Sequence, residues 1–160
     1  MIVMITVIIS CNTKQTKKKV SAADTTAVVI LADTANIKRD TRYFWTSDWD
    51  LKKGLIMKKT TPLSEDSLTP TNMIQKLNDL YPEIQLRFTK ISNDSIFVHI
   101  NKSNYLTRQI GSSGAQAYLA EVTYNLTELK DINFVDISFK EGDHATPGTF
   151  TRTDFIRVKN

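Results

Sequence analysis

Two short segments in the middle of the chain carry an apolar residue at every second position. They are residues 84–88 and residues 96–100, and the pair Asn93 and Asp94 lies between them. Asn and Asp are typical of the tight turn that joins two strands. Because successive side chains of a strand point to opposite faces, the pattern predicts a β-hairpin with one buried face, which includes Phe88. That face requires a layer of helix to cover it.

A helical pattern precedes this hairpin. Thr69 followed by Pro70 is typical of a helix start, because threonine can cap the first turn and proline fits the first helical position. Apolar residues then recur at helical spacing as far as Leu80, and Tyr81 and Pro82 end the pattern. We therefore expect a helix that starts after Thr69.

A second helix is expected over residues 113–129. Apolar residues recur there three and four positions apart, so that Leu119 and Val122 face the core and Glu121 lies on the outer face. Ser112 and Ser113 just before it are expected to cap its first turn.

Three further segments have the composition of strands. Residues 43–45 and 55–57 are expected to form a first hairpin, and residues 132–139 a strand after the second helix. The predicted fold is α+β, with two helices packed on one face of a small mixed sheet. The folded domain is expected to span residues 41–160.

The chain begins with ten mostly apolar residues that end at Cys11, the single cysteine. This length suits the apolar core of a secretory leader and is too short to span a bilayer. The segment before Cys11 resembles a bacterial lipobox, which implies that residues 1–10 are a lipoprotein signal peptide and that Cys11 is lipidated. The opposing interpretation is a buried strand that ends in a core cysteine. Residues 11–40 are expected to form a flexible basic tether, in which the apolar run at residues 27–32 is a short strand or a mobile apolar patch.

The positive charge of the chain is concentrated near its start. The formal net charge is +4, but from Asp40 onward there are 15 basic and 15 acidic residues. A nucleic-acid-binding domain needs its excess charge on the folded surface, so we expect no nucleic-acid partner. The tether lysines would instead lie against anionic headgroups or keep a spacer solvated.

The folded part resembles a GerMN domain, known from sporulation and spore-germination proteins. The resemblance rests on residues 111–119, residues 126–129 and residues 135–142, and it extends forward to the aromatic segment at residues 43–45. It implies a ring-building-motif-like fold, with a helix-strand-strand-helix-strand core after a short hairpin. It also implies a non-enzymatic role in the assembly of envelope complexes, without a cofactor.

No motif for catalysis or metal binding is evident in the sequence. The two histidines, His99 and His144, are far apart, and His99 is expected on the outer face of its strand. Ser112 and Ser113 do not fit the G-x-S-x-G nucleophile motif, because Ala115 stands where glycine is needed.

Two aromatic residues are the candidates for protein contacts. Trp49 lies between two aspartates and is hard to bury, and Phe150 lies in a polar tail. Our leading hypothesis is a membrane-anchored lipoprotein of the cell envelope, facing the periplasm or the exterior. Its domain would bind envelope proteins or associate with itself. The rivals are a lipoprotein that binds a small ligand such as a cell-wall fragment, and a cell-wall hydrolase.

Overall fold

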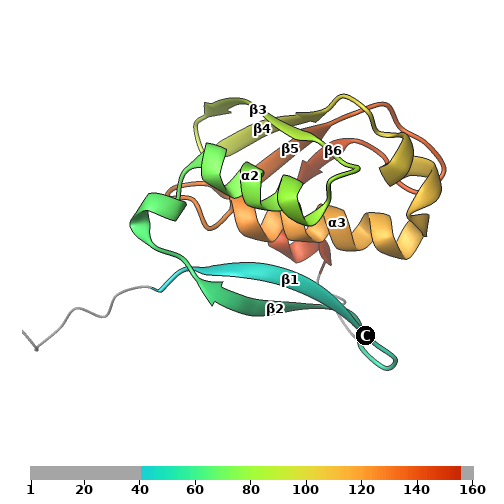
Figure 1. Ribbon diagram of the computed structural model, residues 1–160, viewed down its shortest axis with the longest axis horizontal. Helices are drawn as coiled ribbons and strands as arrows, with labels where there is room; N and C mark the ends of the chain where they lie inside the picture. The colour runs from blue at the N-terminus through green and yellow to red at the C-terminus, as the bar shows by residue number, and fades with distance from the viewer. Residues whose placement is uncertain (1–40, 156–160) are drawn as a thin grey trace, which may run out of the picture. The chain divides into compact units, whose positions relative to one another are not determined.

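The computed structural model describes residues 41–155. Their fold is of the α+β class: two helices lie on one face of a four-stranded mixed sheet, and a two-stranded hairpin precedes them (Figure 1). The predictions for the leader, Cys11, the basic tether and its apolar run lie outside the described residues. In residues 41–155 no helix is both long and apolar enough for a membrane span.

The four-stranded sheet has the order β3-β4-β5-β6. Strands β3 (Leu86–Ser92) and β4 (Ser95–Ile100) form the predicted antiparallel hairpin, β5 (Phe134–Ser138) is parallel to β4, and β6 (Gly148–Phe150) is antiparallel to β5. At the hairpin turn, Asn93 has a φ of 54°, a left-handed conformation that asparagine tolerates better than most residues. The turn residues therefore match the turn that forms.

Helix α2 (Pro70–Leu80) starts as predicted. The Thr69 hydroxyl accepts a hydrogen bond from the amide of Asn72 at 3.2 Å, and Pro70 takes the first helical position. A short 3-10 turn, η1 (Glu65–Ser67), precedes the helix. The side chains that α2 buries are those of Met73, Ile74 and Leu77.

Helix α3 (Gly111–Leu126) starts differently from our expectation. A π-helical turn, η2 (Tyr105–Gln109), leads into it, and Gly111 at the junction has a φ of 77°, which favours glycine. The prediction that Ser112 and Ser113 cap the helix is wrong. Both serines lie inside the first turn, and no side-chain hydroxyl caps the helix start.

The first hairpin pairs β1 (Tyr43–Asp50) with β2 (Gly54–Pro62). The Asp50 carboxylate accepts hydrogen bonds from the amides of Lys53 and Lys52, each at 2.8 Å, and these bonds lower the pKa of Asp50. Trp49, which lies between the two predicted strands, is the next-to-last residue of β1. The hairpin therefore extends further than the apolar pattern suggested.

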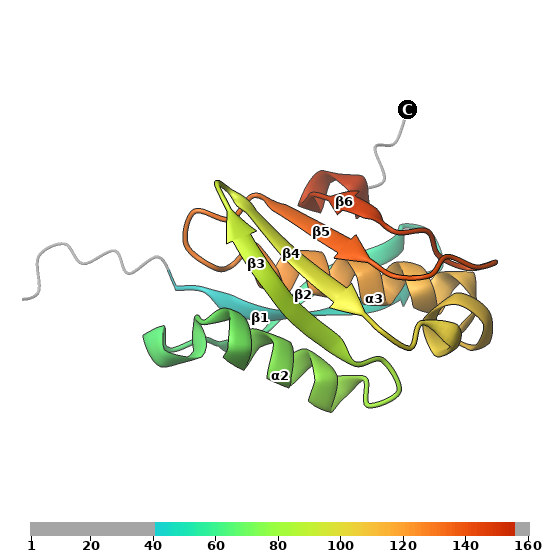
Figure 2. The same ribbon diagram turned by 90° about the horizontal axis from the view of Figure 1, so that it is seen from above.

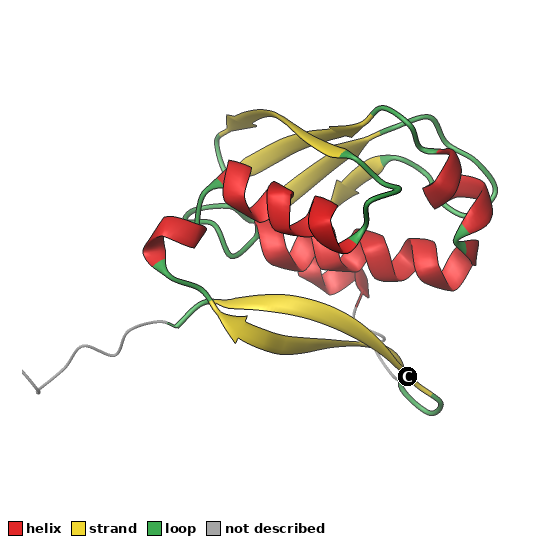
Figure 3. Cartoon of the chain, in the orientation of Figure 1, coloured by secondary structure: helices red, strands yellow, loops and turns green. Residues whose placement is uncertain are grey.

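Helix α3 lies between two β layers. The four-stranded sheet covers one side of it and β1 runs along the other side (Figures 1 and 3). Every residue from 117 to 126 is buried as a result. The prediction that Glu121 lies on an outer face is therefore wrong: its exposed fraction is 3%, because the hairpin covers that side of the helix.

Candidate functional site

Strand β3 is an edge strand, with β4 as its only strand partner among residues 41–155. Phe88 lies opposite Val98 and Ile91 lies opposite Ile96, both fully buried, so Phe88 and Ile91 point to the face that carries the helices. Nevertheless, Phe88 is 46% exposed and Ile91 is 45% exposed. The prediction that Phe88 is buried is wrong.

The exposure of this edge follows from the direction of α2. At the start of β3, the Asn78 side chain accepts a hydrogen bond from the amide of Leu86 at 2.8 Å and donates one to its carbonyl at 3.0 Å. Further along, the strand and the helix diverge (Figure 2). The helix therefore closes the edge at Leu86 and leaves the rest of β3 open.

The outer face of the same strand is basic. Arg87 lies opposite His99, and Lys90 lies opposite Phe97, whose ring centroid is 4.7 Å from the lysine Nζ. Neither cation forms an ion pair with another described residue. The open edge thus combines two exposed apolar side chains with two uncompensated positive charges.

The edge of the first hairpin, in contrast, is closed by α3. The amides of β1 that point away from β2 donate hydrogen bonds to polar side chains. Two of these side chains belong to the helix, at positions 121 and 125, and the third is at position 128 just beyond it. The bonds run from Ser47 N to Glu121 Oε1 at 2.7 Å, from Trp45 N to Asn125 Oδ1 at 2.8 Å and from Tyr43 N to Glu128 Oε2 at 3.3 Å. These side chains stand in for a neighbouring strand, so β1 has no free edge there.

Glu128 also anchors the last described turn, η3 (Arg152–Phe155). Its Oε1 accepts hydrogen bonds from Arg152 Nη2 at 2.6 Å and from Trp45 Nε1 at 2.8 Å. The guanidinium of Arg152 also lies 5.3 Å from the Trp45 ring and 5.1 Å from the Tyr124 ring. This cluster joins the hairpin, α3 and η3, and no local sequence pattern indicated it because its members are far apart in the chain.

Two tyrosines near Glu121 have raised pKa values. Burial raises the pKa of Tyr81, and the Glu121 carboxylate raises it further. Burial also raises the pKa of Tyr118, with smaller contributions from Tyr81 and Glu121. The Tyr118 hydroxyl and Glu121 Oε2 are both buried without a hydrogen-bond partner among the described residues.

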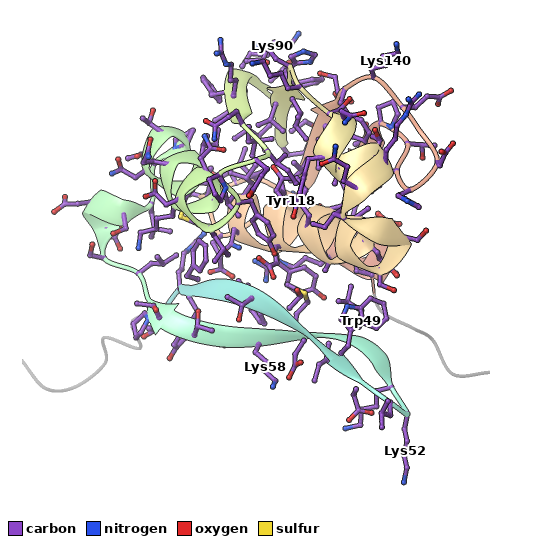
Figure 4. All side chains as sticks on the ribbon, turned by 45° about the vertical axis from the view of Figure 1, so that its right-hand side comes forward. Trp49, Lys52, Lys58, Lys90, Tyr118 and Lys140 are labelled. Carbon is purple, nitrogen blue, oxygen red and sulfur yellow. The ribbon has the colours of Figure 1, made fainter. Side chains whose placement is uncertain are left out.

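Trp49 and Phe150, the two aromatic residues that the sequence indicated for protein contacts, do not belong to β3. Trp49 is 42% exposed and lies on the first hairpin (Figure 4), two positions before the fully exposed Leu51 in the chain. Phe150 lies in β6, is half-buried against the core, and has its ring centroid 5.8 Å from that of Phe155.

The two histidines each contact a serine. His99 lies on the outer face as expected, with Nδ1 2.9 Å from Ser138 Oγ. His144 Nδ1 is 3.1 Å from Ser112 Oγ, a proximity that the sequence did not indicate. A serine nucleophile needs a base that a third group orients, and no described carboxylate binds either histidine. Within residues 41–155, no cluster of three or more His, Cys, Asp or Glu could hold a metal ion.

Comparison of the chain with protein-family models, curated proteins and solved structures found no match.

Proposed function

We propose that this chain is a lipid-anchored envelope protein whose folded domain binds other proteins without catalysing a reaction. The GerMN-like character of the domain is part of the same proposal. The order of its elements, helix-strand-strand-helix-strand after a hairpin, is the order that the resemblance implies. The observation that carries the proposal is the open edge of β3, with Phe88 and Ile91 exposed beside it.

Anchoring is assigned to Cys11. The apolar leader before it and the lysines after it fit a lipidated N-terminus against an anionic membrane. In cells fed a fatty-acid analogue, the wild-type chain should take up the label and the Cys11→Ser variant should not. Equal labelling of the two would refute the lipoprotein assignment and leave the β3 interface to be tested separately.

The proposed occupant of the β3 edge is an extended, acidic segment of a partner protein. A free edge offers backbone hydrogen bonds to an added strand, and exposed side chains beside it supply specificity. On the inner side, Phe88 and Ile91 would contact apolar residues of the added strand. On the outer side, Arg87 and Lys90 would contact acidic ones.

The same charges oppose pairing of two copies through this edge. In an edge-to-edge dimer, Arg87 and Lys90 of both copies would lie on one face near each other, and like charges across a strand pair are destabilising. Lysine on an edge is a common protection against such self-pairing. Self-association through β3 is therefore an outcome that would contradict the proposal.

The interface can be tested with a short synthetic peptide of alternating glutamate and valine, added to the full-length chain. We expect amide chemical-shift changes centred on Phe88 and Ile91, and weaker binding by a matched lysine-valine peptide. The double variant Phe88→Ser/Ile91→Ser should bind the acidic peptide at least about tenfold more weakly. The control variant Leu51→Ser, which also removes an exposed apolar side chain, should bind normally.

Equal binding of the two peptides, or shifts that map to the hairpin around Trp49, would contradict the β3 interface.

One observation favours the hydrolase alternative, namely the contact between Ser112 and His144. The non-enzymatic proposal predicts that His144→Ala and Ser112→Ala leave the protein fully able to complement a deletion. Loss of function in both variants at normal abundance would favour a serine hydrolase instead.

A further inference from the structure

A basic cleft lies at the end of β4 that is remote from the β3–β4 turn. It has a volume of about 400 Å³ and is bounded by the segment that leads into η2, by η2 itself and by the start of the β5–β6 connection. The residues that line it are Asn101, Lys102, Ser103, Asn104, Thr107, Arg108, Lys140 and Glu141. The cleft is separate from the exposed Phe88 and Ile91, so it does not depend on the interface proposed above.

The charges of the cleft are not compensated within the domain. Lys102, Arg108 and Lys140 are positive and Glu141 is negative, which gives the lining a formal charge of +2. The ion pairs of the described residues are Lys58 with Asp48 and Arg152 with Glu128, so none of the three cations in the cleft is paired. Like charges gathered in a concave site raise the local concentration of anions.

The walls of the cleft are fixed by hydrogen bonds between the segments that form them. Ser103 Oγ donates to the carbonyl of Lys140 at 2.7 Å, and Thr107 Oγ1 donates to the carbonyl of Ser103 at 2.9 Å. The amide of His144 donates to the carbonyl of Thr107 at 3.0 Å. Gly142 packs so closely on η2 that a Cβ there would lie 2.8 Å from Thr107 Cβ. The cleft is thus built before any ligand arrives, which lowers the entropic cost of binding.

The backbone of one wall is also unusual. Residues 105–109 form a π-helical turn, a conformation that is rare and is found frequently at functional sites. It places Arg108 at the cleft and exposes its side chain, while Thr107 in the same turn is 2% exposed. Lys140 stands on the opposite connection and extends from the surface of the domain (Figure 4).

A second basic pocket, of about 290 Å³, differs in that its charges are already engaged. Arg42, Lys59 and Arg152 line it together with Glu128. Arg152 pairs with the Glu128 carboxylate, Arg42 donates to the Glu128 carbonyl, and Lys59 lies over the rings of Tyr43 and Trp45. This pocket therefore has fewer unengaged positive charges for an anion than the cleft at η2 has.

We propose that the cleft at η2 binds the phosphoryl group of a small phosphate ester. A phosphate monoester carries a charge close to −2, which matches the +2 lining, and its oxygens can accept hydrogen bonds from arginine, lysine and asparagine side chains. A volume of about 400 Å³ is larger than a bare ion needs and lies in the range of sites for small organic ligands. The phosphoryl group can belong to a soluble ester or to a lipid headgroup, and both present the same chemistry to Arg108 and Lys140.

The test is calorimetric titration of the full-length chain with glycerol 3-phosphate, and with glycerol as the uncharged control. We expect binding of the phosphate ester, none of glycerol, and an affinity that falls as salt is added. Arg108→Gln and Lys140→Gln should each weaken binding about tenfold. Lys52→Gln, which removes an exposed charge at the tip of the first hairpin, should bind as the wild type does (Figure 4). Both cleft side chains are exposed, so thermal melting should not change.

The source of the phosphoryl group is decided by a parallel titration with vesicles that contain phosphatidic acid, whose headgroup is a phosphate monoester. If glycerol 3-phosphate binds and its binding depends on Arg108 and Lys140, the ligand of the site is a soluble ester. If only the vesicles bind, with the same dependence, the ligand is a lipid headgroup. The proposal is overturned if neither binds. It is also overturned if the two variants bind as the wild type does, or if sulfate competes as well as the ester.

Discussion

Glu121 is a buried carboxylate that holds the first hairpin against α3. Its Oε1 accepts hydrogen bonds from the amide of Ser47 at 2.7 Å and from the hydroxyl of Ser47 at 2.5 Å. Removing the acceptor would leave these donors without a partner in a place that water reaches poorly, so Glu121→Ala should lower the free energy of unfolding by about 1 to 3 kcal/mol. Glu121→Gln keeps an oxygen acceptor and should lose less. Urea unfolding of both variants measures this, and a loss below about 0.5 kcal/mol for Glu121→Ala would show that the bonds do not stabilise the fold.

Tyr118 makes the stability of the domain sensitive to alkaline pH. Burial raises its pKa, and that of Tyr81, above the ordinary value of 10.0. Above about pH 10 the unfolded chain releases these protons while the folded chain keeps them, so stability should fall as pH rises further. Tyr118→Phe should make this fall shallower.

Near neutral pH the same substitution should cost little stability, because the Tyr118 hydroxyl is buried without a hydrogen-bond partner among the described residues. Thermal melts at about pH 7 and about pH 11 compare the two conditions. A steeper alkaline loss in Tyr118→Phe than in the wild type would contradict this reading.

At the level of elements, the β1 edge is satisfied by helix side chains rather than by a strand. The Asn125 side chain accepts a hydrogen bond from the amide of Trp45 at 2.8 Å and donates one to the carbonyl of Trp45 at 2.9 Å. Amide hydrogen exchange should therefore be slow at Trp45, although no strand pairs with that side of β1. Asn125→Ala should speed exchange at Trp45 far more than at the amides that β1 shares with β2. Equal acceleration along both edges would mean that the variant loosens the whole hairpin.

The elements also differ in how far the sequence could predict them. The strands of the central hairpin and the start of α2 follow from local rules, because alternation, turn residues and Thr69 with Pro70 act within a few positions. The burial of Glu121 could not be predicted, since periodicity does not say that a second β layer covers the polar side of α3. Alternation predicts the correct face for Phe88. It does not show that α2 leaves this part of β3 uncovered, so it could not predict that Phe88 is exposed. The contact of Ser112 with His144 and the cleft at η2 depend on tertiary packing, which no local pattern encodes.

At the level of the whole molecule, the described domain has three layers and two hairpins whose edges are treated differently. The first hairpin is closed along β1 by the side chains of α3 and Glu128. The central hairpin is open along β3 beyond Leu86, where apolar and basic side chains flank the edge. The β1 edge is thus protected, whereas the β3 edge is free and has exposed apolar and basic side chains beside it that can select an added strand. This contrast is the basis for the proposed protein-binding role.

Site-specific photo-crosslinking in the native cell tests this role most directly. A photoreactive residue would be introduced at position 91 on the β3 edge and, as the control, at position 51 on the hairpin tip. The account predicts that position 91 crosslinks to another protein through an extended segment rich in acidic residues, and that position 51 does not. Crosslinks from position 51 alone, or from position 91 only to other copies of this chain, would contradict it.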